Sequence, residues 1–302
     1  MKVLVTGSAS RLATVLLPRL AADERVRQII GVDRREAEFR DPRYTQVLLD
    51  TRSPNLAPVL KHVDAVIHLA LASNDPERRA INLIGTQNVA RLALAQGARR
   101  FVWLSSAAVY ELPPRARVMN ESHPRRAWPG IGYAEDCVET EAWLDTFEHD
   151  PANFTVIRLR PHLIVGPHLP RFVRASLTAP FYIPFTDRPR LQCVHEDDVA
   201  QALVAALYQD ARGAFNLACA DSATFEEIKR MQHRLLLPLA FPLARSLTRL
   251  GARLGSGIEP AWIEALRYNL VLDTSRARKQ LNWRPRHDTI AACLDGMKPT
   301  HG

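Results

Sequence analysis

Two short stretches near the amino terminus carry residue types whose spacing suits the binding of a dinucleotide. A strand pattern leads into TGSASRLA (6–13) and on into a helical pattern, an arrangement that directs a helix amino terminus at a phosphate. The glycine loop expected at such a site has the pattern G-x-x-G-x-x-G, and this chain has Gly7, Ser10 and Ala13 at the three positions. A Cβ at Ser10 narrows the approach of a phosphate, while its hydroxyl offers a hydrogen bond. A plain strand–turn–helix is the alternative. The loop residues predicted to contact the dinucleotide are Gly7, Ser10, Arg11 and Leu12.

The second stretch is QIIGVD (28–33), a buried strand pattern that ends in an acidic residue. A carboxylate at Asp33 would accept both ribose hydroxyls of NAD and repel the 2′-phosphate of NADP. Arg34 and Arg35 follow and would favour NADP if they turned inward. We therefore predict NAD, with NADP as the less favoured cofactor, and Asp33 as a simple turn residue is the structural alternative. Asp50 ends the next strand pattern and is predicted either to contact the adenine or to have no role in binding.

Short apolar runs alternate with helical patterns through the first half of the chain. Runs rich in Val, Ile and Leu, with helices between them, predict a parallel sheet that is buried on both faces. The predicted strands are 2–6, 28–33, 45–50, 64–70, 100–106 and 154–160, and the predicted helices are 11–23, 82–97 and 133–147. The expected fold is therefore α/β, a Rossmann-type doubly wound parallel sheet with a smaller C-terminal substrate lobe.

The pattern loosens in the second half, where prolines become frequent. We predict an NAD(P)-binding domain at 1–167 and mainly a substrate-binding lobe at 168–302, with some segments returning to the first domain. A helix after Asp198 and a strand at 213–218 are expected. PLARSLTRLGARLG (242–255) is amphipathic, with leucines on one face and arginines on another. Because it lies inside a folded lobe, we expect it to cover a substrate pocket; a helix on a membrane surface is the alternative.

The composition fits an ordinary globular protein, with 47% hydrophobic and 24% charged residues in 302. The net charge of +8 comes mainly from Arg, but no basic run or basic–aromatic interleaving occurs, so no nucleic-acid partner is predicted. No signal peptide and no transmembrane segment are expected. The four cysteines have no metal-ligand spacing, so no metal site is predicted, and reduced thiols of a cytoplasmic protein are expected. They are Cys137, Cys193, Cys219 and Cys293.

Further segments follow one another in an order that is typical of one enzyme family. They are VIHLA (66–70), INLIGTQNV (81–89), FVWLSSAAVYE (101–111), VIRLRPHLIVGP (156–167), LQCVHEDDVAQAL (191–203) and LDTSRARKQLNWRP (272–285). Together with the loop at 6–13 and the strand end at Asp33, they resemble the extended short-chain dehydrogenase/reductases, the NAD-dependent epimerase/dehydratase family. The resemblance implies hydride transfer on a small-molecule substrate such as a nucleotide sugar. It also implies a homodimer formed through two helices like 82–97 and 133–147.

The resemblance also implies roles for single residues. Tyr133 would be the general acid/base, and Ser106 would polarise the substrate carbonyl or alcohol, with a strand-end cap as the alternative role for Ser106. Leu163 stands where the family usually has Asn. The residues that would line the cofactor beyond the loop are Leu69, Ala70, Asn82 and Tyr133.

The family's Tyr is followed four residues later by Lys, but here the fourth residue after Tyr133 is Cys137. A free Tyr has a pKa of about 10, and a nearby ammonium lowers it. Cys137 lies on the same helix face but supplies no positive charge. No Lys occurs between Lys61 and Lys229, so the charge must come from a distant Arg or from the nicotinamide of NAD itself. If the pKa of Tyr133 is not lowered by about 2 units, forming its phenolate costs about 3 kcal/mol more free energy at neutral pH. This slows catalysis without forbidding it.

Two hypotheses of different classes follow. The first is an atypical NAD-dependent oxidoreductase or epimerase that acts on a secondary alcohol or ketone, either a nucleotide sugar or a lipid- or steroid-like molecule, which the apolar 233–255 region favours slightly. The second is a catalytically weak or inactive NAD(H)-binding protein with a regulatory or interaction role. Turnover discriminates between them, since a sensor binds the cofactor and oxidises or reduces nothing.

Overall fold

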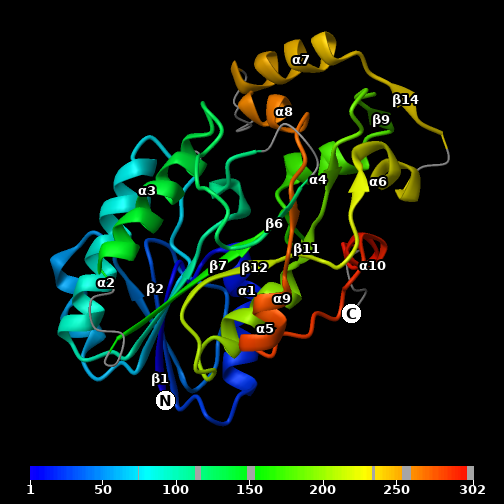
Figure 1. The fold of residues 1–302 in the computed structure, drawn as a ribbon. Coiled ribbons are helices and arrows are strands. Elements are labelled where there is room, and N and C mark those ends of the chain that lie inside the picture. The colour runs from blue at the N-terminus through cyan, green and yellow to red at the C-terminus, as the bar shows by residue number, and fades with distance from the viewer. Residues whose placement is uncertain (74, 113–116, 148–153, 233–234, 254–259, 298–302) are drawn as a thin grey trace.

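The computed structural model describes residues 1–73, 75–112, 117–147, 154–232, 235–253 and 260–297. At its centre lies a seven-stranded sheet with the order β12-β7-β5-β4-β1-β2-β3 (Figure 1). All neighbouring strands in this sheet are parallel. The strands are β1 (Lys2–Thr6), β2 (Gln28–Asp33), β3 (Tyr44–Leu48), β4 (Ala65–His68), β5 (Arg100–Leu104), β7 (Thr155–Pro161) and β12 (Gly213–Leu217). The predicted doubly wound parallel sheet is confirmed.

Helices cover both faces of this sheet, which explains why its strands are apolar throughout. Val3 and Val5 face α1 and α5, and Leu4 faces the side of α2 and α3; all three side chains are fully buried. The longer helices are α1 (Arg11–Ala22), α2 (Thr86–Ala95), α3 (Gly132–Phe147), α4 (Arg171–Thr178), α5 (Glu196–Ala205), α6 (Phe225–Gln232) and α7 (Phe241–Arg253). Shorter ones are α8 (Ala261–Ala265), α9 (Ser275–Gln280), α10 (Ile290–Asp295), the π-helix η3 (Ala80–Gly85) and the single turns η1 (Pro54–Leu56), η2 (Pro58–Leu60) and η4 (Ala107–Val109).

The second half of the chain contributes to both parts of the molecule. α5 packs beside α1, and β12 extends the central sheet next to β7. The rest builds a lobe above the carboxyl ends of the strands (Figure 1). Its paired short strands are β8 (Ile164–Val165) with β11 (Val194–His195), β9 (Phe181–Tyr182) with β14 (Leu237–Pro238), β10 (Arg190–Leu191) with β13 (Ala223–Thr224), and β6 (Val118–Met119) with β15 (Val271–Leu272).

Two predicted boundaries are wrong in a way that matters for the site. β3 ends at Leu48, so Asp50 lies in the following loop rather than at a strand end. The helix expected after Asp198 begins at Glu196, because the His195 side chain accepts a hydrogen bond from the Asp197 amide and caps the helix there.

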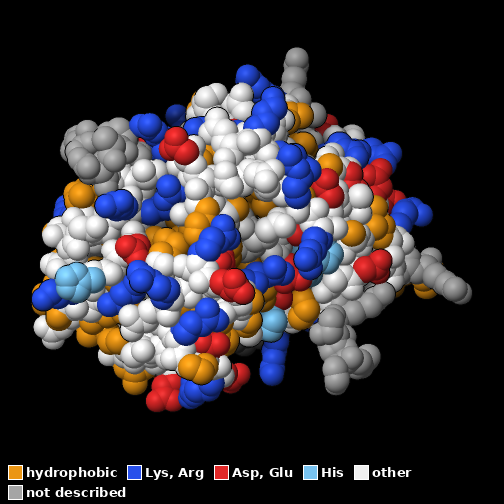
Figure 2. Space-filling model, turned by 90° about the horizontal axis from the view of Figure 1, so that it is seen from below, with side chains coloured by type: hydrophobic (Ala, Val, Ile, Leu, Met, Phe, Trp, Pro, Cys, Tyr) orange, Lys and Arg blue, Asp and Glu red, His pale blue; other side chains and the backbone are white. Residues whose placement is uncertain are grey.

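No helix in the described ranges is long and apolar enough to cross a membrane. On the face shown in Figure 2, Lys and Arg side chains are interspersed with Asp and Glu.

Candidate active site

The phosphate loop retains glycine at the one position where the backbone demands it. Gly7 has a φ of +69°, and a Cβ there would lie 2.7 Å from the backbone of Leu69 and Ala70. Ser10 caps α1, since its Oγ accepts a hydrogen bond from the Ala13 amide at 3.4 Å. Ala13 is fully buried in the core between α1 and the sheet. The loop is therefore closely packed and ends at a helix amino terminus, which fits a dinucleotide phosphate.

Asp33 faces this loop from the end of β2. Its carboxylate accepts hydrogen bonds from the amides of Ala9 at 3.1 Å and Arg35 at 3.0 Å. Arg34 points elsewhere and pairs with Asp75 at 3.0 Å. The Arg35 side chain turns to the loop, where it donates to the Ala9 carbonyl at 3.2 Å and lies 4.0 Å from the Asp33 carboxylate. This arrangement suits a ribose hydroxyl better than a 2′-phosphate.

Asp50 does not take the position that the sequence pattern indicated. Arg52 holds both of its carboxylate oxygens at 2.8–2.9 Å and bridges onward to Glu77. The side-chain hydrogen bonds from Arg52 lower the pKa of Asp50. The Asp50 side chain is thus part of an ion-pair network with Arg52 and Glu77, and its contact with the adenine stays a prediction.

Leu69, Ala70 and Asn82 lie where β4 ends, beside the phosphate loop. Leu69 and Ala70 form the backbone wall against Gly7. Asn82 is fully buried, and its amide spans the amide and carbonyl of Ala72 and the carboxylate of Asp136 on α3. The Asn82 side chain therefore positions the loop after β4 and is not itself open to a ligand.

A cavity of about 520 Å³ begins at Arg11 and Leu12 and runs into the C-terminal lobe. Ser106 and Tyr133 line it, and most of its remaining walls are apolar. The described basic side chains along the cavity are Arg11, His162 and His168, and none is a lysine. Apolar walls from the lobe include Trp128, Leu169, Leu177, Phe225, Trp262 and Leu266.

Tyr133 stands in the first turn of α3, with Ser106 and Cys137 as neighbours. Ser106 caps η4 by accepting a hydrogen bond from the Ala108 amide at 3.1 Å, and both Ser106 and Tyr133 line the cavity. Burial raises the pKa of Tyr133 well above its ordinary value, and the adjacent Cys137 raises it further. Burial also raises the pKa of the Cys137 thiol. At neutral pH the pair is therefore an uncharged phenol beside an uncharged thiol.

From the sequence, His162, His168 and His195 are candidates to approach the pocket, and a surface or hydrogen-bonded structural role is the favoured alternative for each. The structure places His168 in the cavity wall, with a carboxylate partner that the sequence did not indicate. His168 Nδ1 lies 2.6 Å from Glu196 Oε1, and both side chains line the cavity. His162 also lines the cavity, but its ring is held by hydrogen bonds within the protein, and His195 lies outside the lining. Burial lowers the pKa of His162 to about 4, and its ring hydrogen-bonds the amide of Leu163 and the carbonyl of Leu270. His195 caps α5 and stacks on His287, outside the cavity lining.

A buried ion pair behind Ser106 was also missed. Glu141 on α3 is fully buried, accepts a hydrogen bond from Ser105 Oγ at 2.6 Å and pairs with Arg160 on β7. Arg160 also donates to the hydroxyl of Tyr110 at 2.8 Å. This network ties Ser105, which directly precedes Ser106 in the segment after β5, to the helix that carries Tyr133. Glu141 and Arg160 lie 19 residues apart in the sequence, and no motif indicates that they are in contact.

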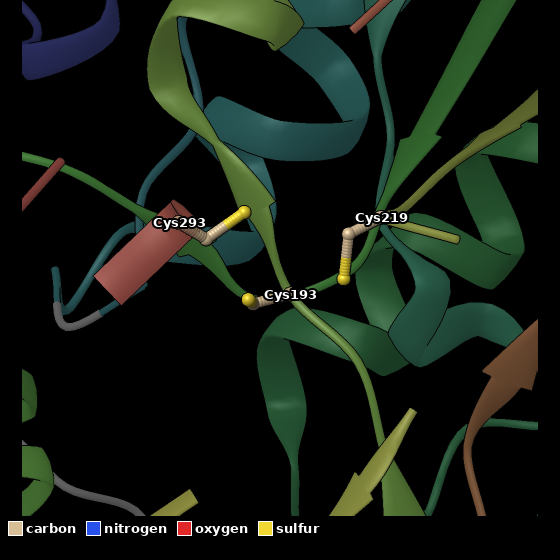
Figure 3. Close-up of side chains that lie close together, drawn as sticks. All are labelled: Cys193, Cys219 and Cys293. Atoms are coloured by element: carbon tan, nitrogen blue, oxygen red, sulfur yellow. The ribbon is translucent and has the colours of Figure 1, made fainter. Parts of the chain in front are cut away.

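Three of the four cysteines come together, although their spacing predicted no cluster. The sulfurs of Cys193, Cys219 and Cys293 all lie within 4.8 Å of one another, and the three side chains are buried (Figure 3). Cys219 and Cys293 have backbone carbonyl partners at 3.5 and 3.2 Å, those of Asp221 and His287. Two of the thiols thus have hydrogen-bond partners, and all three pack in one hydrophobic cluster, as small apolar side chains do. Of the three, Cys193 reaches the lining of the cavity.

Comparison with known proteins agrees with this geometry. The model of the NAD dependent epimerase/dehydratase family matches residues 3–218. An uncharacterized protein of Mycobacterium tuberculosis is 28% identical over 310 residues, which cover 97% of this chain and 82% of that protein. A sterol-4-alpha-carboxylate 3-dehydrogenase, decarboxylating, of Bos taurus is 32% identical over 147 residues, covering 47% of this chain and 41% of the enzyme.

The fold is shared with solved structures at low sequence identity. The UDP-glucuronic acid 4-epimerase of Bacillus cereus in complex with NAD superposes with a TM-score of 0.74 at 17% identity, over 100% of both chains. The family match extends across the phosphate loop, Asp33, Ser106 and Tyr133, and the predicted cofactor, NAD, is the one that this family uses. The chain belongs to the NAD dependent epimerase/dehydratase family.

Proposed function

We propose that this protein is an NAD-dependent oxidoreductase that transfers a hydride between the nicotinamide and a secondary alcohol or ketone of an apolar, lipid- or steroid-like substrate. The observation that carries the proposal is the cavity that joins the phosphate loop to Ser106 and Tyr133 and continues between apolar walls. A nucleotide sugar brings a diphosphate, which proteins hold with Arg or Lys side chains. Arg11 is the one described Arg or Lys in the cavity lining, and it sits at the cofactor end. The partial likeness to a sterol dehydrogenase points the same way.

NAD would be held by Gly7, Ser10, Arg11 and Leu12 at its pyrophosphate, by Asp33 at a ribose, and by Leu69 and Ala70 along its length. When bound, it supplies or accepts the hydride. NADP is the less favoured cofactor because the Asp33 carboxylate would repel its 2′-phosphate and Arg34 is paired with Asp75.

The raised pKa of Tyr133 suggests which direction is easier. A neutral phenol donates its proton to a carbonyl oxygen as that oxygen gains charge, so Tyr133 is prepared for ketone reduction. Ser106 would hydrogen-bond the same oxygen and fix its position. Alcohol oxidation requires the phenolate, which is formed only at high pH or under the field of a positively charged nicotinamide.

The decisive experiment combines titration calorimetry with turnover. We expect NAD and NADH to bind more tightly than NADP and NADPH, and NADH to be consumed with a panel of apolar ketones. Tyr133→Phe should reduce kcat by about 10²–10⁴-fold while leaving the Kd of NADH unchanged. Full activity in that variant would exclude Tyr133 as the acid, and absence of any cofactor binding would end the oxidoreductase proposal.

One observation favours a second candidate function, an NAD(H)-binding regulatory or interaction protein. Cys137 removes the positive charge that would make Tyr133 a base near neutral pH. Cofactor binding without turnover across both apolar and sugar substrates would support this alternative. A homodimer through η3, α2 and α3 is compatible with either function, and Ile84 and Leu94 are exposed on the first two.

A further inference from the structure

Helix α7 presents its apolar face to solvent. Leu243, Leu247 and Leu250 are each 52% exposed, and their spacing places them on one side of the helix. The opposite side packs onto the lobe: Ala244 is buried, and the Phe241 ring contacts the Phe185 ring in a tilted arrangement, with 5.9 Å between the ring centroids. None of the α7 leucines lines the cavity. The expectation that this helix directly covers the substrate pocket is therefore wrong, because α8 lies between them and supplies Trp262 to the lining.

Further large apolar side chains are exposed in the chain just before the helix and on the strand paired with it. Leu235 is 73% exposed, and Leu237 on β14 pairs in register with Phe181 on β9, where both side chains are also exposed. In Figure 1, α7, β14 and β9 lie together at the end of the lobe farthest from the central sheet. Large exposed apolar patches of this kind mark interaction surfaces.

The charges on α7 indicate what binds there. The helix contains three arginines and no acidic residue. Arg245 pairs inward with Glu264 at 2.7 Å. Arg249 and Arg253 flank the leucine face and form no ion pair with any described residue. A second copy of this face would bring the same unpaired arginines and no acidic partner from α7, whereas an anionic bilayer supplies acyl chains for the leucines and phosphates for the arginines.

We propose that α7, with Leu235, Leu237 and Phe181, is an interfacial docking surface for anionic lipid membranes. The apolar face would enter the boundary between headgroups and acyl chains, with Arg249 and Arg253 reaching the phosphates. Since α7 packs on α8 and Trp262 of α8 lines the cavity, docking would bring the substrate lobe to the lipid. The inference stands without the proposed function, because membrane binding requires no turnover.

Vesicle flotation of the full chain tests the proposal. We expect binding to vesicles of phosphatidylcholine and phosphatidylglycerol, weak binding to phosphatidylcholine alone, and release by salt. The triple variant Leu243→Ser, Leu247→Ser, Leu250→Ser should lose binding at least tenfold. Arg249→Gln with Arg253→Gln should lose it about 30-fold on anionic vesicles, about fivefold for each charge. Circular dichroism should show both variants folded, because the five side chains are exposed.

Matched controls are available on another part of the surface. Leu48→Ser removes a leucine that is 55% exposed on β3, and Arg99→Gln removes an exposed arginine. Neither should alter vesicle binding. Equal loss in these controls, or unchanged binding in the α7 variants, would overturn the proposal. A third outcome would also overturn it: the protein sediments as a dimer, the triple leucine variant sediments as a monomer, and neither binds vesicles. The leucine face would then bind a second copy of the chain. NADH binding, measured separately, reports on the proposed function alone.

Discussion

Two turns of the chain differ from the pattern of the family, the phosphate loop at 6–13 and the first turn of α3. In the loop, each replacement has a structural use: Ser10 caps α1, and Ala13 fills the core against the sheet. In α3, Cys137 is equally well buried, but a neutral thiol cannot take over the electrostatic role of an ammonium. Packing tolerates small residues of several kinds, whereas a pKa depends on charge, so substitutions that are equally compatible with folding differ in their chemical consequences.

Among the substitutions that compare these two turns, the largest effect should come from restoring the missing charge. Cys137→Lys should lower the pKa of Tyr133 and raise the rate of alcohol oxidation at neutral pH by about 10–100-fold, provided that the ammonium reaches the phenol. In the unsubstituted protein this rate should rise continuously with pH, because the phenolate is the reactive form and the pKa is raised. The variant should reach its plateau at lower pH.

A pH–rate series of the two proteins makes this measurement, with Cys137→Ser as the uncharged control. An identical profile for all three would show that the cofactor, rather than residue 137, sets the pKa of Tyr133. A thermal unfolding curve is needed alongside, because the lysine enters a fully buried position.

Gly7→Ala tests the one glycine that the phosphate loop retains from the expected pattern. Its Cβ would approach the backbone of Leu69 and Ala70 at 2.7 Å, so we expect a loss of about 1–3 kcal/mol in folding or NAD binding. Gly97→Ala is the matched control, since Gly97 has a φ of +83° with no atom within 4 Å of the added Cβ. Equal effects in calorimetry and thermal unfolding would mean that φ alone, and not the close approach, requires glycine at position 7.

Asp33→Asn should weaken NADH binding about tenfold, because a charge-assisted hydrogen bond contributes about 1.5–3 kcal/mol and the amide retains part of it. NADPH affinity should stay constant or rise, since the repelling carboxylate is gone. Titration calorimetry with both cofactors gives the ratio. A parallel fall for the two would indicate that Asp33 acts only by holding Ala9 and Arg35.

The smallest effect concerns the Ser10 cap. Ser10→Ala should cost about 1 kcal/mol in the free energy of unfolding, and Ser10→Gly only a few tenths. Urea denaturation with an unchanged m-value would measure both. If the glycine variant also binds NADH more tightly, the Cβ at position 10 does narrow the phosphate site.

Local sequence patterns were sufficient to predict the central sheet. β1 and β2 have the predicted bounds, because uninterrupted apolar runs report strands buried on both faces. Gly7 and Asp33 could be identified as candidates because their roles depend on positions next to such strands. The boundary error at Asp50 arose where the apolar pattern continues beyond the last paired residue of β3.

Contacts between residues far apart in the sequence could be seen only in the tertiary structure. The pairing of His168 with Glu196, the ion pair of Glu141 with Arg160 and the meeting of three cysteines join residues that share no local periodicity. The leucine and arginine pattern of α7 is compatible with an apolar face that points either toward the lobe or toward solvent. Because Ala244 packs against the lobe, the leucines point toward solvent. By itself the sequence determined the sheet, the phosphate loop and the identity of the residue beside Tyr133. The three-dimensional contacts determined the apolar cavity and the exposed helix, because burial depends on what the rest of the chain places opposite each side chain.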